Sequence, residues 1–126
     1  MYLINRTDYK NDFIKKIVEF AMPSGTKKPF LLVVRYGSIS TGICYDYFPI
    51  ISVTLEKNAK YPLLRNDKPR AKNYIRNIPI ESEVAHLVFL VAHESGHYLS
   101  NGKLSEGDCD AYAIHTVSQW RLFSSF

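Results

Sequence analysis

Two histidines and a glutamate in the second half of the chain have a spacing that points directly to chemistry. The run from His93 through Glu94 to His97 reads HESGH, so the histidines are four residues apart. On a helix both imidazoles then lie on one face, one turn apart, and can bind the same metal ion. Glu94 directly follows the first histidine, where a carboxylate can reach a metal-activated water without being a ligand itself. The motif therefore predicts a hydrolytic metal site with Glu94 as its base.

The residues before this motif predict that it lies on a buried helix within residues 80–102. They are apolar nearly all round, as a buried helix is: Val84, Ala85, Leu87, Val88, Phe89, Leu90, Val91 and Ala92. Ionisable groups at the end of such a helix need a compensating partner, which a metal ion would supply. We expect Gly102 at the C′ position that ends the helix. His86, about 10 Å from His93 along the axis, is expected to be a core or cleft histidine.

Two histidines do not complete a catalytic zinc site, which normally has three protein ligands and one water. The residues after the motif that could supply the third are Glu106, Asp108, Cys109, Asp110 and His115. At about 3.6 residues per turn, Glu106, Cys109 and Asp110 share one helix face. Asp108 lies off that face, and His115 lies on roughly the opposite side. Spacing alone therefore leaves three candidates for the third ligand.

The motif and the residues that follow it resemble the gluzincin metallopeptidases. The resemblance covers residues 93–113: HExxH is followed by Glu106-x-x-x-Asp110, and the run CDAYA at residues 109–113 is similar to the family's Glu-x-x-Ala-Asp-x-Phe/Tyr-Ala pattern. It implies that Glu106 is the third zinc ligand and that Asp110 orients a ligand histidine. Cys109 stands where the family usually has alanine, which leaves ligation by its thiolate open. The short separation of His97 from Glu106 is similar to that of minimal gluzincins and of the small repressor-cleaving metallopeptidases of mobile elements.

The whole chain predicts an α+β fold in a single domain, residues 1–126. A hydrophobic content of 46% is sufficient for one packed core. The expected elements are a helix over residues 8–22 capped by Thr7 or Asp8, strands over residues 30–35, 43–48 and 50–56 that form a small meander, the metal helix, and a helix over residues 105–121 that begins with a capping box at Ser105. Together with the resemblance, this order implies a zincin-like fold: an N-terminal helix, a small and mostly antiparallel sheet, a buried metal-binding helix and a C-terminal helix.

The strand at residues 50–56 has the alternation of a half-buried strand. Ile51, Val53 and Leu55 point to one face and polar residues point to the other. As an edge strand it would offer an extended peptide a partner for strand addition.

Residues 57–79 are the most basic stretch of the chain. Its one acidic residue is Asp67, and its seven cationic residues are Lys57, Lys60, Arg65, Lys68, Arg70, Lys72 and Arg76. Three prolines argue against long regular structure, and no nucleic-acid motif surrounds the charges, so we expect a solvated loop. The alternative is a basic lip that attracts an acidic substrate or a nucleic acid.

The end of the chain is apolar and has no obvious stop signal. Its large side chains are Trp120, Leu122, Phe123 and Phe126. We expect them to pack on the domain or on another copy of the chain, which would form a homo-oligomer. The start of the chain is mixed and polar rather than signal-like, and no apolar run has the length of a membrane span, so a cytoplasmic protein without a membrane partner is expected.

These observations predict a zinc metallopeptidase with one Zn²⁺ per chain and a protein or peptide substrate. Hydrolysis would use a metal-activated water and Glu94 as general base. Two other classes stay open: a zincin-fold binding or regulatory protein that is catalytically silent or autoinhibited, and a nucleic-acid binder built on the basic stretch, although nucleic acid is not the expected partner. A deformylase also uses HExxH, but its cysteine ligand is expected before the motif, whereas Cys109 follows it.

Overall fold

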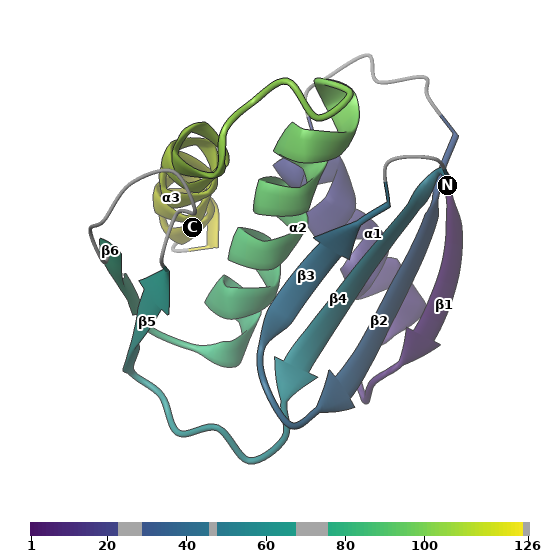
Figure 1. Cartoon of the computed structure of the whole chain (residues 1–126). Helices are drawn as coiled ribbons and strands as arrows, with labels where there is room; N and C mark the ends of the chain where they lie inside the picture. The colour runs from purple at the N-terminus through teal and green to yellow at the C-terminus, as the bar shows by residue number, and fades with distance from the viewer. Residues whose placement is uncertain (23–28, 46–47, 68–75, 125–126) are drawn as a thin grey trace.

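Three helices and two sheets make up the part of the chain that the computed structural model describes, residues 1–22, 29–45, 48–67 and 76–124. In chain order these are β1 (Tyr2–Arg6), α1 (Asn11–Ala21), β2 (Leu31–Gly37), β3 (Thr41–Cys44), β4 (Ile50–Glu56), β5 (Leu63–Asp67), β6 (Arg76–Ile80), α2 (Glu83–Leu99) and α3 (Glu106–Ser124). Figure 1 shows α2 in the middle, with the larger sheet on one side, α3 and the β5–β6 hairpin on the other, and α1 behind it. The α+β class is as predicted.

The larger sheet is mixed, with the strand order β1-β2-β4-β3. The pairs β1–β2 and β2–β4 are parallel, and only the pair β3–β4 is antiparallel. The expectations of a meander and of a mostly antiparallel sheet are therefore wrong. The main cause is β1, a strand to which the sequence analysis gave no element: it pairs with β2 across the crossover that contains α1.

The strand β4 lies inside the sheet, between β2 and β3, so the expectation that residues 50–56 form an edge strand is wrong. Its alternation was read correctly, because Ile51, Val53 and Leu55 are fully buried. The edge next to β4 is formed by β3, which begins at Thr41 and ends at Cys44 rather than spanning residues 43–48. Part of that expected strand, residues 46–47, lies outside the described residues.

The turn after β1 explains why α1 begins three residues later than expected. The Asn5 side chain organises this turn: its Nδ2 donates to the Tyr9 carbonyl (2.7 Å), and its Oδ1 accepts from the Thr7 amide (2.9 Å). Neither Thr7 nor Asp8 caps the helix, since the N-cap position is held by Lys10, without a side-chain cap.

The helix α2 is the buried helix that the apolar run predicts, and it is capped at both ends. The Ser82 hydroxyl accepts from the amide three residues later (3.1 Å). At the other end the Gly102 amide donates to the His97 carbonyl (2.8 Å) and the Asn101 amide to the Tyr98 carbonyl (3.2 Å), which is the Schellman arrangement. Asn101 (φ 54°) therefore holds the C′ position expected for Gly102, and Gly102 (φ 77°) follows it.

The core lies between the larger sheet and the helices. The inward-facing side chains of β2 and β4 meet those of α1 and α2 in one cluster: Ile14, Ile17, Leu32, Val34, Ile51, Val53, Leu55, Leu87, Val88 and Phe89. The first turn of α2 is held in addition by Glu83, whose Oε1 accepts from the hydroxyls of Tyr9 (2.8 Å) and Tyr36 (3.3 Å). These contacts fix the rotation of α2 about its axis, and so fix the direction in which its motif faces.

Within the stretch that was expected to be a loop, β5 and β6 form a two-stranded antiparallel sheet. Pro79 is tolerated within β6 because each strand of a two-stranded sheet has one unpaired edge. Ile78 and Ile80 are buried, which anchors the hairpin. Of the basic stretch at residues 57–79, which was expected to be a solvated loop, residues 68–75 lie outside the described residues.

The helix α3 begins as predicted. Its first turn is capped by the Ser105 hydroxyl, which accepts from the Asp108 amide (3.1 Å). The helix extends to Ser124, three residues beyond the predicted end. Among the helices that the structure describes, none combines the length and apolar character needed to cross a membrane.

The described part of the apolar tail packs on α1. The Trp120 ring meets Phe13 and Phe20 edge-on, with centroids 6.3 and 5.2 Å apart, and Phe123 also contacts Phe20 (5.7 Å). Leu122 and Phe123 nevertheless stay 61% and 59% exposed. Phe126 lies outside the described residues.

Candidate metal centre

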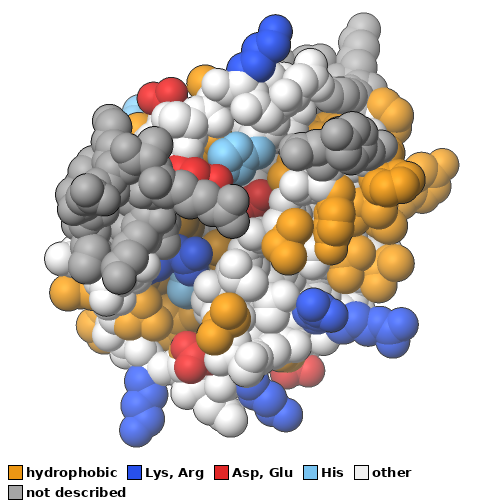
Figure 2. All heavy atoms as spheres, viewed as in Figure 1, with side chains coloured by type: hydrophobic (Ala, Val, Ile, Leu, Met, Phe, Trp, Pro, Cys, Tyr) orange, Lys and Arg blue, Asp and Glu red, His pale blue; other side chains and the backbone are white. Residues whose placement is uncertain are grey.

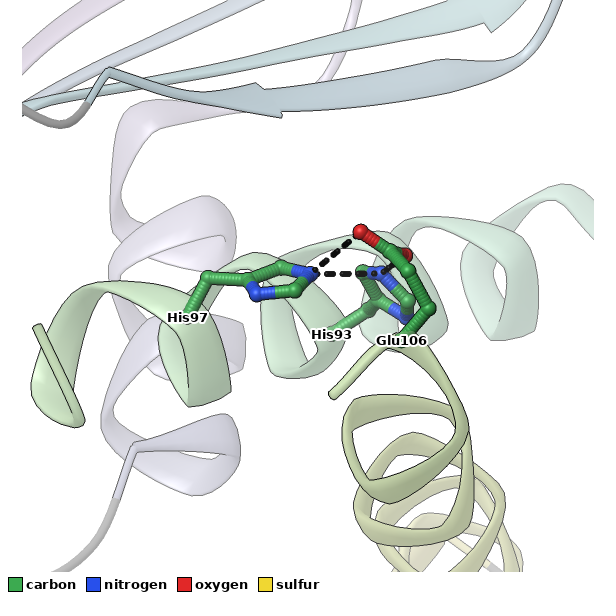
Figure 3. A group of neighbouring side chains, drawn as sticks. All are labelled: His93, His97 and Glu106. Carbon is green, nitrogen blue, oxygen red and sulfur yellow. Dashed lines mark hydrogen bonds and ion pairs between the residues drawn. The ribbon is translucent and has the colours of Figure 1, made fainter. Parts of the chain in front are cut away.

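His93, His97 and Glu106 come together where α2 meets α3. The two imidazoles project from one face of α2, and the Glu106 carboxylate reaches them from the first turn of α3 (Figure 3). Each side chain offers one donor atom, and the three atoms lie within 4.8 Å of one another. The Glu106 side chain is 52% exposed, so this cluster is open to solvent on the α3 side.

The distances within this cluster suit a tetrahedral metal ion. His93 Nε2 lies 2.9 Å from Glu106 Oε2, His97 Nε2 lies 3.0 Å from Glu106 Oε1, and the two Nε2 atoms are 3.3 Å apart. When zinc is bound by nitrogen and oxygen at about 2.0–2.1 Å, neighbouring ligand atoms are separated by about 3.3 Å. Three lone-pair atoms at such distances need a shared cation or proton between them. The residues present therefore fit a divalent metal ion.

Asp110 fixes the orientation of His93 from behind. Its Oδ1 lies 2.9 Å from His93 Nδ1, and the Asp110 carboxylate is almost fully buried. Burial opposes the charged form of His93, but the hydrogen bond to Asp110 and the charges of Glu94, Asp110 and Glu106 outweigh it and raise the pKa. A carboxylate at Nδ1 keeps the proton on that nitrogen, so the Nε2 lone pair faces the cluster.

Glu94 lies beside the cluster without belonging to it. Its Oε1 is 3.9 Å from His93 Nε2, and the side chain is buried. Burial raises the pKa of Glu94, against the opposing effect of the two histidines. This is a carboxyl group that can take and return a proton next to a bound metal.

Gly42 is a site residue that the sequence analysis missed. A Cβ atom at this position would lie only 2.6 Å from Glu94 Cγ, so the backbone of β3 touches the Glu94 side chain directly. A glycine inside a strand is the available sequence signal for such a close approach.

The other candidate ligands do not join the cluster. Cys109 is fully buried beneath Gly96, where an added Cβ would come within 3.0 Å of its sulfur. Burial and nearby carboxylates raise the pKa of the Cys109 thiol to about 12, which keeps it protonated. Asp108 and His115 are exposed. The structure therefore places Glu106 with the histidines, and Asp110 behind one of them.

A second polar group lies two turns before the cluster on the same face of α2, centred on buried His86. Its Nε2 is 3.1 Å from Arg65 Nη1, and its Nδ1 is 3.0 Å from the Tyr61 hydroxyl. Because a guanidinium can only donate, Nε2 is the acceptor and Nδ1 carries the proton. Burial, assisted by the Arg65 charge, lowers the pKa of His86 to about 4. The sequence predicted the burial of His86 but gave no signal for its partners.

We expect the metal-free protein to lose stability through His86 as the pH falls. The folded pKa of about 4 lies below the ordinary value of 6.5, so between these values the unfolded chain binds a proton that the folded chain does not. The free energy of unfolding of the wild type, measured against that of His86→Gln by urea titration, should fall across this window by up to about 1.4 kcal/mol per pH unit. A difference that stays constant from pH 7 to pH 4.5 would contradict this.

We also expect zinc affinity to separate the residues around the cluster. Glu106→Ala removes a donor atom and should abolish most zinc binding, whereas Asp110→Asn should weaken it roughly 10- to 100-fold. Asp108→Ala removes the same charge from an exposed position of the same helix turn and is the matched control. Competition with a chromogenic chelator measures all three. Equal affinities of Glu106→Ala and Asp108→Ala, or loss of zinc in Cys109→Ala, would show that the third ligand is misassigned.

Comparisons of the chain with protein-family models, with curated proteins and with solved structures gave no match. The gluzincin resemblance therefore stays a prediction, and the function has to be argued from the geometry of the cluster.

Proposed function

We propose that this protein is a zinc-dependent peptidase of the gluzincin type, with a zincin-like fold. His93, His97 and Glu106 would hold one zinc ion, Asp110 would orient His93, and Glu94 would act as general base. The observation that carries this proposal is the position of Glu94: a buried carboxylate 3.9 Å from His93 Nε2, adjacent to three converging donor atoms but not one of them.

The proposed chemistry divides between the metal and the chain. A zinc ion at this site would lower the pKa of a water molecule and polarise a carbonyl group. The Glu94 carboxylate accepts a proton from the attacking water and donates it to the amine that leaves.

The sheet supports a peptide as the substrate rather than a small amide. The strand β3 pairs with β4 along one edge only, and its Gly42 touches the Glu94 side chain. An extended peptide that adds to the other edge of β3 would therefore pass over the proposed base. Strand addition was expected at residues 50–56. Because that strand is interior and β3 is an edge strand, the proposed partner for the peptide is β3.

Autoinhibition, the alternative to an active peptidase, would require a part of the chain such as the apolar tail to cover the metal cluster, and the described residues do not support this. Trp120 and Phe123 pack against α1, and Trp120 lies about 21 Å along the axis of α3 from Glu106.

We expect Glu94→Gln to keep the metal and lose hydrolysis. The amide preserves the shape of the side chain but cannot accept the proton, and the donor atoms of His93, His97 and Glu106 are untouched. Zinc content by elemental analysis should equal that of the wild type, while cleavage of a peptide library should fall at least about 100-fold, the lower range of a general base's contribution. Cleavage by Glu94→Gln at the wild-type rate would refute the proposed mechanism.

Gly42→Ala should impair hydrolysis through the position of Glu94. The added methyl group must displace the Glu94 side chain, and a misplacement of about 1 Å at a reacting group can reduce the rate about 100-fold. Gly37→Ala is the matched control, because its methyl group meets the Thr54 side chain at the same 2.6 Å but does not touch the site. Zinc affinity should be unchanged in both variants. If both lose activity in proportion to their lost stability, Gly42 has no specific role.

A further inference from the structure

The outer face of the larger sheet is the face turned away from the helices. Side chains alternate along β2 and β4, and the buried ones point towards the helices: Leu32, Val34, Ile51 and Val53. Their neighbours in each strand therefore point outwards. The described helices all lie on the other side of this sheet (Figure 1). The strand register arranges the outward side chains in three rows that cross β1, β2, β4 and β3.

Two of these rows are almost entirely apolar. The tyrosine row consists of Tyr2, Leu31, Ile50 and Tyr45, and the central row consists of Ile4, Val33, Ser52 and Ile43. Phe48, in the turn that leads into β4, adds a further exposed ring beside the tyrosine row. Figure 2 shows hydrophobic side chains gathered over this part of the sheet.

The third row contains two positive charges. Arg6 and Arg35 lie next to each other in it, followed by Thr54 and Thr41. Arg35 Nε donates to Thr54 Oγ1 (3.3 Å), which holds this side chain against the sheet. The outer face therefore has an aromatic end, an apolar centre and a cationic end.

The exposed area of this face is large enough for an interface between two protein molecules. Parallel strands usually belong to sheets that are covered on both faces, and two of the three strand pairs here are parallel. Tyr2, Tyr45 and Phe48 are 74%, 45% and 64% exposed, so together they offer roughly 300–450 Å² for burial. This is on the order of half of the area, about 800 Å², that each partner contributes to a stable interface. The aliphatic and arginine side chains of the same face add to it.

The order of the rows makes the outer face complementary to a second copy of itself. A twofold axis parallel to the strands would gather the arginines of both copies at one end, where like charges repel. A twofold axis perpendicular to the strands reverses the rows, so the arginine row of each copy lies over the tyrosine row of the other. There the face of an aromatic ring attracts a guanidinium. The two central rows then meet each other, in the aligned packing that twisted sheets adopt about 10 Å apart.

We infer that the outer face of the larger sheet is the interface of a homodimer, in which two sheets pack face to face with their strands antiparallel. The inference is independent of the proposed peptidase function. The outer face lies on the side of the sheet opposite to α2, so this dimer does not cover the cluster of His93, His97 and Glu106.

Sedimentation equilibrium tests the dimer. Interfaces of standard size have dissociation constants of about 1 μM or tighter, so at about 50 μM the mass should be twice the 14.5 kDa of one chain. Ile4→Glu and Ile43→Glu each place two like charges in the centre of the interface, and each should raise the dissociation constant at least about 100-fold. Ile114→Glu makes the same change at an exposed position of α3 and should leave the dissociation constant unchanged.

A milder pair of variants covers a failure to fold, as judged by thermal unfolding. Ile4→Thr keeps a β-branched side chain but loses apolar area in both copies, and should raise the dissociation constant about tenfold. Ile114→Thr is its matched control and should behave as the wild type.

The orientation of the two copies has its own test. Tyr2→Leu keeps an apolar side chain but removes the ring that Arg6 of the other copy would cover. Because two such contacts are lost per dimer, the dissociation constant should rise about 5- to 30-fold. In an Arg6→Gln background the same change should cost less, since the two residues interact. Strictly additive effects would overturn the antiparallel orientation.

Three results would overturn the dimer itself. The first is a wild-type protein that stays monomeric at about 50 μM, well above the expected dissociation constant. The second is a dimer that survives both Ile4→Glu and Ile43→Glu, and the third is a dimer that Ile114→Glu dissociates equally. Phe123→Glu identifies the competing interface, because its dissociation of a dimer that Ile4→Glu leaves intact would assign the contact to the apolar tail.

Discussion

The pair formed by His93 and Asp110 holds the cluster in place. Both side chains are buried, and Asp110 Oδ1 lies 2.9 Å from His93 Nδ1 where α2 and α3 cross. A buried carboxylate is costly unless it is paired and hydrogen-bonded, so this contact fixes the register of the two helices. Glu106 lies one turn before Asp110 on the same face of α3, and the pairing therefore delivers its carboxylate to the histidines. Gly96 permits the close approach, because a larger residue there would strike Cys109.

The two halves of the chain supply different parts of the site. The helices α2 and α3 provide every donor atom of the cluster and both carboxylates beside it. The sheet and the hairpin provide what lies around it: the edge of β3 on one side and Arg65 of β5 on the other. In the proposed peptidase, the helices would therefore determine the reaction, and the strands would determine which peptides reach it.

The parts of the structure that the sequence predicted are those that depend on local spacing. The helical repeat predicted α2 and the common face of His93 and His97, and the capping residue at Ser105 predicted the start of α3. The family resemblance, rather than spacing, favoured Glu106 and Asp110 over Cys109. The structure separates these residues in the same way: Glu106 and Asp110 meet the histidines, whereas Cys109 packs against Gly96. That Glu106 binds a metal stays a prediction.

The parts that could not be predicted depend on pairing between distant segments. The strand order, the parallel partnership of β1 with β2, and the β5–β6 hairpin all join residues whose local patterns do not identify a partner. The contacts of Gly42 with Glu94 and of Arg65 with His86 are recognisable only once β3 and β5 have been placed beside α2. A lone glycine and one arginine within a basic stretch carry no such information in the sequence.

The contact between Gly42 and Glu94 couples the position of the base to the stiffness of an edge strand. A strand with one neighbour is held by half the hydrogen bonds of an interior strand, and β3 is a short edge strand. A peptide that pairs along its whole length would give β3 a second neighbour, and would thereby hold Glu94 more firmly in place. In the proposed peptidase the substrate would complete the wall that aligns the base. Peptides too short to span β3 would then be turned over slowly even at saturating concentration, because binding energy far from the cleaved bond is used to organise the reacting groups.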